Sequence, residues 1–193
     1  ADGRIIVKPT DQKLINEGNP ELLIYPALIV KEKLVVSNGK QTDDIVSCLD
    51  PAAGSVASIV KALKGWEYEP DEPTYTPRIS GCILDNTAAL SIIKRAFDST
   101  ALHYTFQVPL IAGWGKFIST YRGTNENPLP SFCGEPVDVK LPFKSAEETA
   151  RAVYEALGPS SGSGDFRVAV AAVVQSKNGT TDCYIINRQD RAG

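Results

Sequence analysis

Two polar loops of the 193-residue chain carry residue types that bind anionic or polar ligands. The first runs from Ser37 to Asp43, where an apolar strand ends in Ser37-Asn38-Gly39 and Thr42-Asp43 opens a helix. The backbone N–H groups at the start of a helix can hold an anion. The same spacing is also typical of an ordinary helix cap made by the Thr42 hydroxyl. This loop therefore either only turns the chain or also holds a ligand.

The second loop begins at Glu69, reads EPDEPTYTPRISG, and places an arginine at the mouth of a strand. Pro77 fixes the backbone there, and Arg78 begins the apolar strand that follows. A guanidinium in this position can hold a phosphate or a carboxylate through two parallel hydrogen bonds. The alternative is a structural arginine that pairs with an acidic residue of the loop, which is Glu69, Asp71 or Glu72. The spacing does not decide between the two.

The remaining catalytic inventory is thin. His103 is the only histidine, no carboxylate stands at a metal-ligand spacing from it, and it is interpreted as a structural or surface residue. The chain has no phosphate loop and no G-x-G-x-x-G element. The cysteines lie far apart, fit no zinc motif, and are interpreted as reduced thiols of a cytoplasmic protein. They are Cys48, Cys82, Cys133 and Cys183.

Composition narrows the class of protein. Hydrophobic residues make up 42% of the chain and charged residues 22%, which is enough to bury a normal core. The net charge of -3, without long runs of one sign, argues against a nucleic-acid partner. No apolar run approaches the roughly 20 residues that a membrane span needs. The sequence therefore predicts a single globular domain over residues 1–193.

The elements that must position these loops begin with strands. GRIIVKP predicts a short strand, and LLIYPALIV and KLVVSNG predict a hairpin around residues 31–33. Thr42 is expected to cap a helix through Cys48, with acidic residues in its first turn. Pro51 is expected to start a second helix, PAAGSVASIVKALKGW. The apolar positions of this helix are Val56, Ile59, Val60 and Leu63.

The second half of the chain continues with strands and one helix. EYEPDEPTYTP holds three prolines in eleven residues and predicts no helix. Strands are expected at RISGCIL, AALSIIKRA, LHYTFQVPL and KFISTYRG, followed by a proline-rich connection, NENPLPSFCGEP, and a possible strand, VDVKLPF. A helix follows from a capping box of Ser145 and Glu148 to Gly158. The chain closes as a hairpin around Asn178-Gly179.

This order of elements predicts an α+β fold of antiparallel strands interrupted by helical blocks. It lacks the strict alternation of a doubly wound sheet. VAVAAVV, near the end of the chain, is apolar on both faces, so its strand is expected to be covered on both sides. Two sheets packed on each other, with helices outside, would satisfy both observations.

Several motifs in a fixed order resemble one known family. They are LLIYPALIV…LVVSNGKQTD, YEPDEPTYTPRISG and FISTYRGTNENPLPSFCGEP. The resemblance is to the archaeal-type inosine monophosphate (IMP) cyclohydrolase family, and is closest to its bacterial branch, in which Y-T-P-R-I-S-G and N-P-L-P-S-F-x-G-E-P stretches follow in this order. It covers the chain from about Ile5 to Asn187. Family members begin with a further segment, so this chain is expected to lack the N-terminal strands of the domain.

The resemblance implies a fold and a reaction. The family fold is a four-layer αββα sandwich of two mostly antiparallel sheets, similar to N-terminal-nucleophile hydrolases but without their nucleophile. In the family reaction the carboxamide nitrogen of the formamido-imidazole ribonucleotide attacks the formyl carbon, and water leaves. The resemblance thus implies a purine ribonucleotide as substrate, no cofactor and no metal. It also implies a homo-oligomer, while the charge and the lack of a long apolar run argue against nucleic-acid and membrane partners.

Two residues are the expected catalytic groups under this resemblance. Tyr25, in LLIYPAL, matches a tyrosine of the family motif and would donate a hydrogen bond to the developing alkoxide, with cations lowering its pKa of roughly 10. The alternative is a core tyrosine in an apolar strand. Arg78 is the second residue, and would orient the base or the phosphate together with Thr76.

The expected substrate-binding residues lie in the two loops and in the later proline-rich connection. Because Asp43 and Asp44 disfavour a phosphate at the helix start, a ribose or base contact is expected there. Cys133 lies in the later connection and is not interpreted as a nucleophile. The binding residues are Asn38, Thr42, Thr76, Tyr121 and Phe132, with Ser37 less favoured.

Three functions fit these observations. The first is the cyclohydrolase. The second is a catalytically silent relative that only binds purine nucleotides. The third is a different amidohydrolase on the same fold, because a fold does not determine the chemistry.

Overall fold

The computed structural model describes residues 3–11, 13, 20–31, 33–124, 126–159, 164–176 and 178–191. The chain forms two compact units, Ala1–Val139 and Lys140–Gly193. The first contains a large antiparallel sheet and two of the longer helices, and the second contains a hairpin and a third helix. The predicted α+β class is confirmed.

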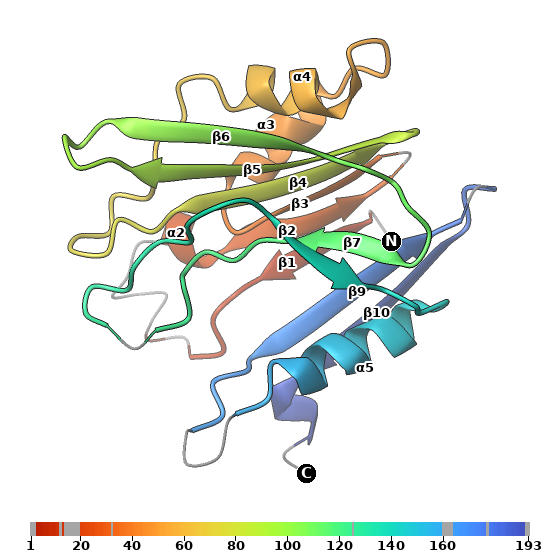
Figure 1. Cartoon of the computed structure of the whole chain (residues 1–193). Coiled ribbons are helices and arrows are strands. Elements are labelled where there is room, and N and C mark those ends of the chain that lie inside the picture. The colour runs from red at the N-terminus through yellow and green to blue at the C-terminus, as the bar shows by residue number, and fades with distance from the viewer. Residues whose placement is uncertain are drawn as a thin grey trace. The chain divides into compact units, whose positions relative to one another are not determined.

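The six-stranded sheet of the first unit has the strand order β1-β2-β3-β4-β5-β6 (Figure 1). Every neighbouring pair in this sheet is antiparallel. Both the short first strand and the hairpin around residues 31–33 are therefore confirmed. The strands are β1 Arg4–Val7, β2 Tyr25–Val30, β3 Leu34–Ser37, β4 Arg78–Leu84, β5 Thr87–Arg95 and β6 Ala101–Val108.

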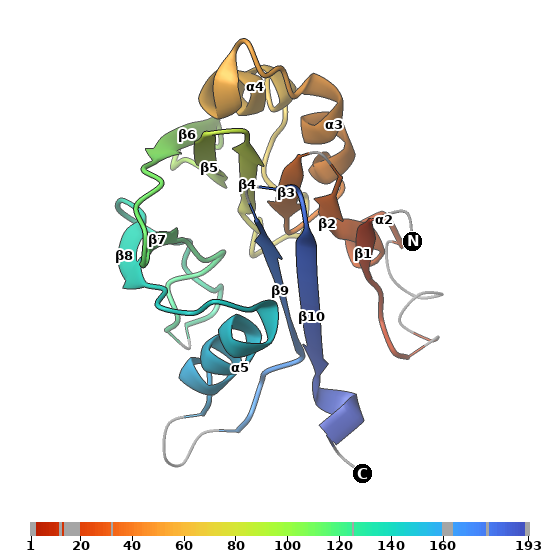
Figure 2. The same cartoon turned by 90° about the vertical axis from the view of Figure 1, so that its right-hand side faces the viewer.

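Two helices, α3 (Gln41–Cys48) and α4 (Gly54–Ala62), cover one face of this sheet (Figures 1 and 2). Of the four apolar positions predicted for the second helix, Ile59 and Leu63 are buried, as expected. Val56 and Val60 are 36% and 53% exposed, so these two apolar positions do not belong to the core. They lie one turn apart along the helix, on the side away from the buried Ser58 and Ala62. The core between helices and sheet contains Val35, Ile45, Leu49, Ile59, Ala62, Leu63, Cys82, Leu84, Ala89 and Ile93.

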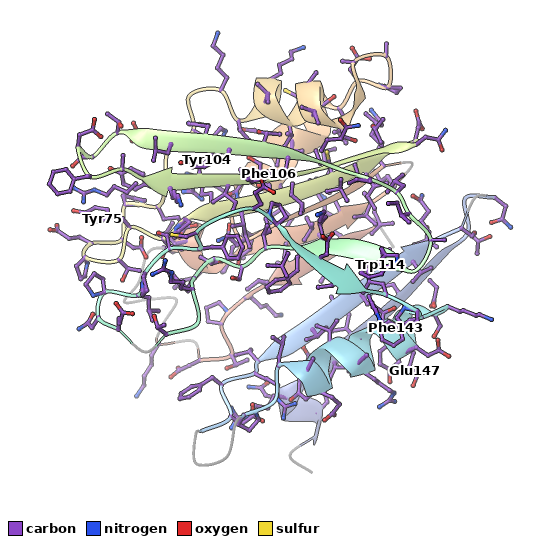
Figure 3. All side chains as sticks on the ribbon, viewed as in Figure 1. Tyr75, Tyr104, Phe106, Trp114, Phe143 and Glu147 are labelled. Carbon is purple, nitrogen blue, oxygen red and sulfur yellow. The ribbon has the colours of Figure 1, made fainter. Side chains whose placement is uncertain are left out.

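The opposite face of the six-stranded sheet is apolar as well. Cross-strand pairing puts Val36 opposite Gly81, Gly81 opposite Leu90, and Leu90 opposite Phe106. On β6 the rings of Tyr104 and Phe106 stack with their centroids 6.4 Å apart (Figure 3). What covers this face stays a prediction.

Several element boundaries differ from the expected ones. A short helix, α2 (Pro20–Leu23), takes up the first residues of the expected LLIYPALIV strand. The α4 helix begins three residues after Pro51, which instead lies in a turn. The strand expected at KFISTYRG is β7 (Trp114–Phe117), which starts earlier and ends sooner. It pairs with β8 (Val137–Lys140) in a separate two-stranded sheet.

The second unit contains α5 (Ala146–Ala156) packed on the hairpin of β9 (Ala169–Gln175) and β10 (Thr181–Asn187), followed by the short helix η1 (Arg188–Arg191). Ser145 caps α5 and accepts a hydrogen bond from the Glu148 N–H at 3.1 Å, as predicted. In a standard capping box the Glu148 carboxylate would accept from the Ser145 N–H. Here it accepts from the N–H of Lys144, the residue before. The core of the second unit consists of Ala146, Ala150, Tyr154, Ala172 and Ile186.

Only one face of β9 packs against α5, through Val170, Ala172 and Val174. The cover expected on its other face, and with it the stacking of two sheets, stays a prediction. None of the helices in the described part of the chain is both long and apolar enough to cross a membrane.

Candidate functional site

The antiparallel register gathers the two polar loops and Tyr25 at one edge of the six-stranded sheet. Tyr25 begins β2 and Arg78 begins β4, while the strand between them, β3, ends at Ser37. Leu28 pairs with Val36, and Ser37 pairs with Ser80. Continuing this register places Gly39 level with both Tyr25 and Arg78. We use the name sheet-edge site for Tyr25, Ser37, Gly39 and Arg78 together with Glu69.

Arg78 is buried in the sheet-edge site and bound on several sides. Arg78 is only 4% exposed. Its Nη1 donates to Glu69 Oε1 at 3.0 Å and to Gln41 Oε1 at 3.2 Å. Its Nε donates to the Glu67 carbonyl at 2.9 Å, and the guanidinium lies 5.1 Å from the ring centroid of Trp66. This is the arrangement of the structural alternative, in which Arg78 pairs with Glu69. A phosphate clamp by Arg78 stays a prediction.

Gly39 allows this ion pair to approach the backbone. A Cβ atom on residue 39 would lie 2.6 Å from Gln41 Oε1 and 2.7 Å from Arg78 Nη1. Both distances are shorter than any ordinary carbon contact, so a side chain there would displace the guanidinium. The glycine of the Ser-Asn-Gly element is thus explained by a close approach.

The ionisable groups of the sheet-edge site are shifted toward their neutral forms. Burial raises the pKa of Glu69, the nearby Arg78 partly offsets this rise, and Asp71 adds to it. Burial lowers the pKa of Arg78 against the opposing effect of the two carboxylates. The pKa of Tyr25 is raised by burial and then by the charge of Glu69. The expectation that cations lower the pKa of Tyr25 is therefore wrong, because the charge that acts on it is a carboxylate.

Asn38 has a protein partner for each of its hydrogen-bonding positions. Its Nδ2 donates to the Pro77 carbonyl at 2.8 Å and to Thr120 Oγ1 at 3.3 Å. Its Oδ1 accepts from the Ile79 N–H at 2.8 Å and from Gln41 Nε2 at 3.3 Å. A carboxamide has two protons and two lone pairs, so these four contacts use its capacity. Asn38 thus ties the end of β3 to the start of β4, and its binding role stays a prediction.

Thr42 does not cap the helix, so that prediction is wrong. The N-cap of α3 is Lys40, which makes no side-chain capping bond. The Thr42 hydroxyl instead donates to the Gly39 carbonyl at 3.0 Å and lies 2.5 Å from the Ser37 hydroxyl. It closes the turn before the helix, because the helix starts two residues earlier than the pattern suggested. Thr42 is 0% exposed, and its contact with a ligand stays a prediction.

Thr76 and Tyr121 meet where the second loop contacts the segment that leads into the later proline-rich connection. The two hydroxyl oxygens lie 2.7 Å apart. Thr76 also bonds to Asp71, through its backbone N–H at 2.6 Å and through its hydroxyl. Phe132 is buried in the same connection, and its carbonyl accepts from Lys94 Nζ at 3.0 Å. The structure therefore brings three of the predicted residues, Thr76, Tyr121 and Phe132, to two facing loops.

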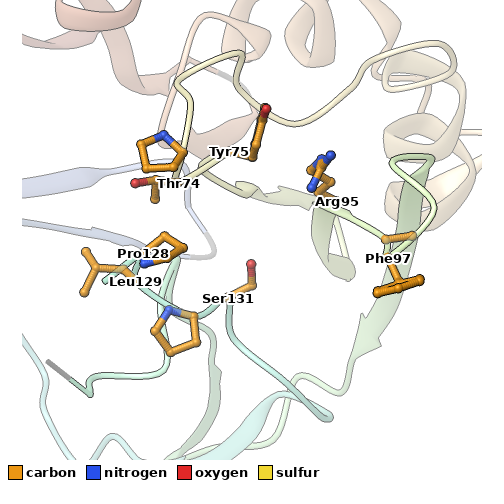
Figure 4. A pocket seen from close by; sticks show the side chains of 10 residues that line it. Thr74, Tyr75, Arg95, Phe97, Pro128, Leu129 and Ser131 are labelled. Atoms are coloured by element: carbon orange, nitrogen blue, oxygen red, sulfur yellow. The ribbon is translucent and has the colours of Figure 1, made fainter. Parts of the chain in front are cut away.

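These two loops and the β5–β6 turn bound an open pocket of about 360 Å³ (Figure 4). Arg95 lies in its wall, with its guanidinium 4.3 Å from the ring centroid of Tyr75. Arg95 Nη2 also donates to the Ser99 hydroxyl at 2.6 Å. The lining residues are Pro73, Thr74, Tyr75, Arg95, Ala96, Phe97, Pro128, Leu129, Pro130 and Ser131.

Sequence reasoning missed three polar residues of this region. Gln41 is fully buried and links Asn38 to Arg78. Glu69 and Asp71 were considered only as partners of Arg78. No local signal distinguishes them, because their roles depend on which loops meet. Among the residues that the structure describes, no three His, Cys, Asp or Glu side chains are grouped so that they could hold a metal ion.

Comparison with known proteins gives one family and two named relatives. The family model described as "IMP cyclohydrolase-like protein" matches residues 1–180 and so spans both units. The IMP cyclohydrolase of Methanopyrus kandleri is 39% identical over 79 residues, which cover 41% of this chain and 39% of that protein. The IMP cyclohydrolase of Methanothrix thermoacetophila is 29% identical over 126 residues, which cover 65% of this chain and 59% of that protein.

The aligned regions thus span less than two thirds of either relative. The family match is broader than both and contains every residue of the sheet-edge site. The expected resemblance is confirmed, and the chain belongs to the family of IMP cyclohydrolase-like proteins.

Proposed function

We propose that this protein is an IMP cyclohydrolase, which closes the purine ring of 5-formamidoimidazole-4-carboxamide ribonucleotide with loss of water. The observation that carries the proposal is the register that brings Tyr25 and Arg78 to the same end of neighbouring strands, where Arg78 holds Glu69. Family membership and the two archaeal relatives support the same reaction. Because phosphorylated intermediates do not cross membranes unaided, we place this activity in the cytoplasm. We also expect the protein to be a homo-oligomer.

Tyr25 and Glu69 offer the two proton positions that the ring closure needs. The carboxamide nitrogen is a poor nucleophile, so a base must take its proton as it attacks the formyl carbon. Glu69 is the proposed base, since burial raises its pKa and makes it a stronger proton acceptor than an exposed carboxylate. The formyl oxygen becomes an alkoxide, and Tyr25 donates to it. Tyr25 protonates this alkoxide, and Glu69 passes the proton that it took from the carboxamide nitrogen to the resulting hydroxyl, which leaves as water. The former formamide nitrogen gives its proton back to Tyr25, and the C=N bond that forms completes the aromatic pyrimidine ring.

The 5′-phosphate requires a cation other than Arg78, because Arg78 is already paired with Glu69. We propose Arg95, whose guanidinium lines the pocket between the two loops. Ser131 and Thr74 line the same pocket and could donate further hydrogen bonds. The base would then reach toward the sheet-edge site.

Replacing Arg95 by glutamine should weaken the binding of IMP but not that of inosine. A hydrogen bond to a charged group contributes about 1.5–3 kcal/mol, so the dissociation constant of IMP should rise roughly 10- to 100-fold. Inosine lacks the phosphate and should bind as before. Isothermal titration calorimetry measures both constants.

Arg122→Gln is the matched control, because Arg122 is exposed in the same connection and does not line the pocket. It should leave both affinities unchanged. Equal losses for IMP and inosine in Arg95→Gln would show that Arg95 does not hold the phosphate.

The activity itself is tested by mixing the protein with the formamido ribonucleotide. IMP should form and be seen by its ultraviolet absorbance, and a chelator should leave the rate unchanged. If IMP formed no faster than in the uncatalysed reaction, the proposal that this protein is a cyclohydrolase would be refuted. If IMP still bound under those conditions, the silent nucleotide-binding relative would be the better description.

A further inference from the structure

Three polar side chains form a continuous chain from one loop to the other. Asp71 accepts the backbone N–H of Thr76 at Oδ1, at 2.6 Å, and the Thr76 hydroxyl at Oδ2. The Thr76 oxygen lies 2.7 Å from the Tyr121 hydroxyl oxygen. The order is therefore Asp71, Thr76, Tyr121.

Counting protons gives this chain a direction. A carboxylate has no proton to donate, so the Thr76 hydroxyl must be the donor in its hydrogen bond to Asp71, and this bond uses its single proton. The Thr76 oxygen can then only accept, and the proton in the second bond must come from Tyr121. With that proton used inside the protein, the Tyr121 oxygen can offer only a lone pair to a ligand.

Backbone contacts hold both ends of this chain in place. The Asp71 carbonyl accepts from the N–H groups of Thr74 and Tyr75, both at 3.0 Å. On the other side, Tyr121 forms a β-bridge with Ser131, and the N–H of the residue after Tyr121 bonds to the Pro130 carbonyl at 2.9 Å. The direction of the hydrogen bonds is thus built on ordered backbone at both loops.

We propose that Asp71, acting through Thr76, holds Tyr121 as a hydrogen-bond acceptor that selects a neutral donor of the bound nucleotide. The donor is a ribose hydroxyl or the N–H of the base. A phosphate is disfavoured beside Tyr121, because it brings only acceptors and meets the negative charge of Asp71. The identity of the ligand rests on the proposed function, whereas the direction of the hydrogen bonds does not.

The direction is tested without any ligand. The Raman doublet of tyrosine reports whether its hydroxyl donates or accepts, and subtracting the spectrum of Tyr121→Phe isolates residue 121. The wild type and Thr76→Ser, which keeps the hydroxyl, should show a donating Tyr121. Thr76→Val, which keeps the shape and removes the hydroxyl, should lose that signature against its own Thr76→Val/Tyr121→Phe reference. An accepting Tyr121 in the wild type, or a Thr76→Val spectrum like the wild type, overturns the inference.

The selection is tested by calorimetric titration with IMP, 2′-deoxy-IMP, 3′-deoxy-IMP and 1-methyl-IMP, each analogue lacking one donor. The wild type should bind at least one analogue about tenfold more weakly than IMP, or about 1.4 kcal/mol. The analogue affected tells whether Tyr121 meets the ribose or the base. Tyr121→Phe and Thr76→Val should lose this discrimination, and Thr76→Ser should keep it.

The outcomes separate the two proposals. Equal binding of all four nucleotides by the wild type, or unchanged discrimination in Tyr121→Phe, overturns the selective role of Tyr121 while leaving the cyclohydrolase intact. A wild type that binds none of them overturns the proposed function and the ligand part of this inference together. Melting temperatures of the three single variants identify any that fail to fold. If Thr76→Val is one of them, Tyr121→Phe carries the comparison, with Thr76→Ser as its control.

Discussion

A Tyr25→Phe protein is expected to form IMP about 100-fold more slowly than the parent, or more slowly still. The change removes one hydroxyl and keeps the ring in its place at the start of β2. Since burial and Glu69 raise the pKa of Tyr25, this hydroxyl keeps its proton at neutral pH and can donate it. The donated bond strengthens only when the formyl oxygen becomes an alkoxide, so the affinity for substrate should barely change. Turnover and IMP affinity are the two measurements.

Stability and a second tyrosine provide the controls for this variant. Losing one hydroxyl should change the free energy of unfolding by no more than about 1 kcal/mol, the net value of one hydrogen bond. Tyr68→Phe also removes a bonded hydroxyl, which donates to the Ser99 carbonyl at 2.9 Å, and should turn over normally. Normal turnover in Tyr25→Phe would instead assign Tyr25 to packing.

An Arg78→Met protein is expected to lose about 3–5 kcal/mol of unfolding free energy at neutral pH. The substitution leaves the Glu69 carboxylate without its counter-charge in a site where Glu69 is only 8% exposed. It also removes the donors to Gln41 and to the Glu67 carbonyl. Glu69→Gln alone should cost less, because an amide oxygen can still accept from Arg78 and burial already disfavours the carboxylate. Chemical denaturation of the variants measures these differences.

The loss in Arg78→Met should depend on pH, with a sign that follows from Glu69. Burial raises the folded-state pKa of Glu69 above its ordinary 4.5, and removing Arg78 takes away the effect that opposes this rise. A raised folded pKa means that stability is fully present below the unfolded pKa and is lost as the pH rises through the folded pKa. The deficit against the parent should therefore be smallest near pH 4.5 and grow toward neutrality.

Adding Glu69→Gln to Arg78→Met should recover part of the loss at neutral pH and flatten this pH dependence. The double variant holds no ionisable group at either position, so nothing in the pair is left to titrate. A deficit of the same size at every pH, unaffected by Glu69→Gln, would mean that the pair is not coupled electrostatically.

Most strands could be predicted from the sequence because their signals are local. The turn at residues 31–33 and the Asn178-Gly179 turn each lie between apolar runs, and both hairpins are present. Thr42 shows where local signals fail. A threonine near a helix start fits a cap and also fits the turn before it, and only the contact with Ser37 and Gly39 decides between them.

The site was less predictable, for a physical reason. Arg78 and its acidic partner lie nine residues apart in one loop, so the pairing could be considered from spacing. Thr76 and Tyr121 are separated by 45 residues, and nothing in either stretch encodes that their hydroxyls meet. Gln41 gave no signal at all, because a polar residue at a helix start is ordinarily exposed rather than fully buried.

The strand order of the large sheet has a kinetic consequence. Four of its five pairings join strands that follow one another through short connections or a single loop, whereas β3 and β4 are separated by residues 38–77, which include both covering helices. This is the longest connection between any two paired strands of the sheet, so closing it costs more chain entropy than closing the others. That pairing also brings Asn38 to Pro77 and Ile79. We therefore expect the pairing of β3 with β4 to form late in folding, and the contacts of Asn38 that stabilise it to form together with the sheet-edge site.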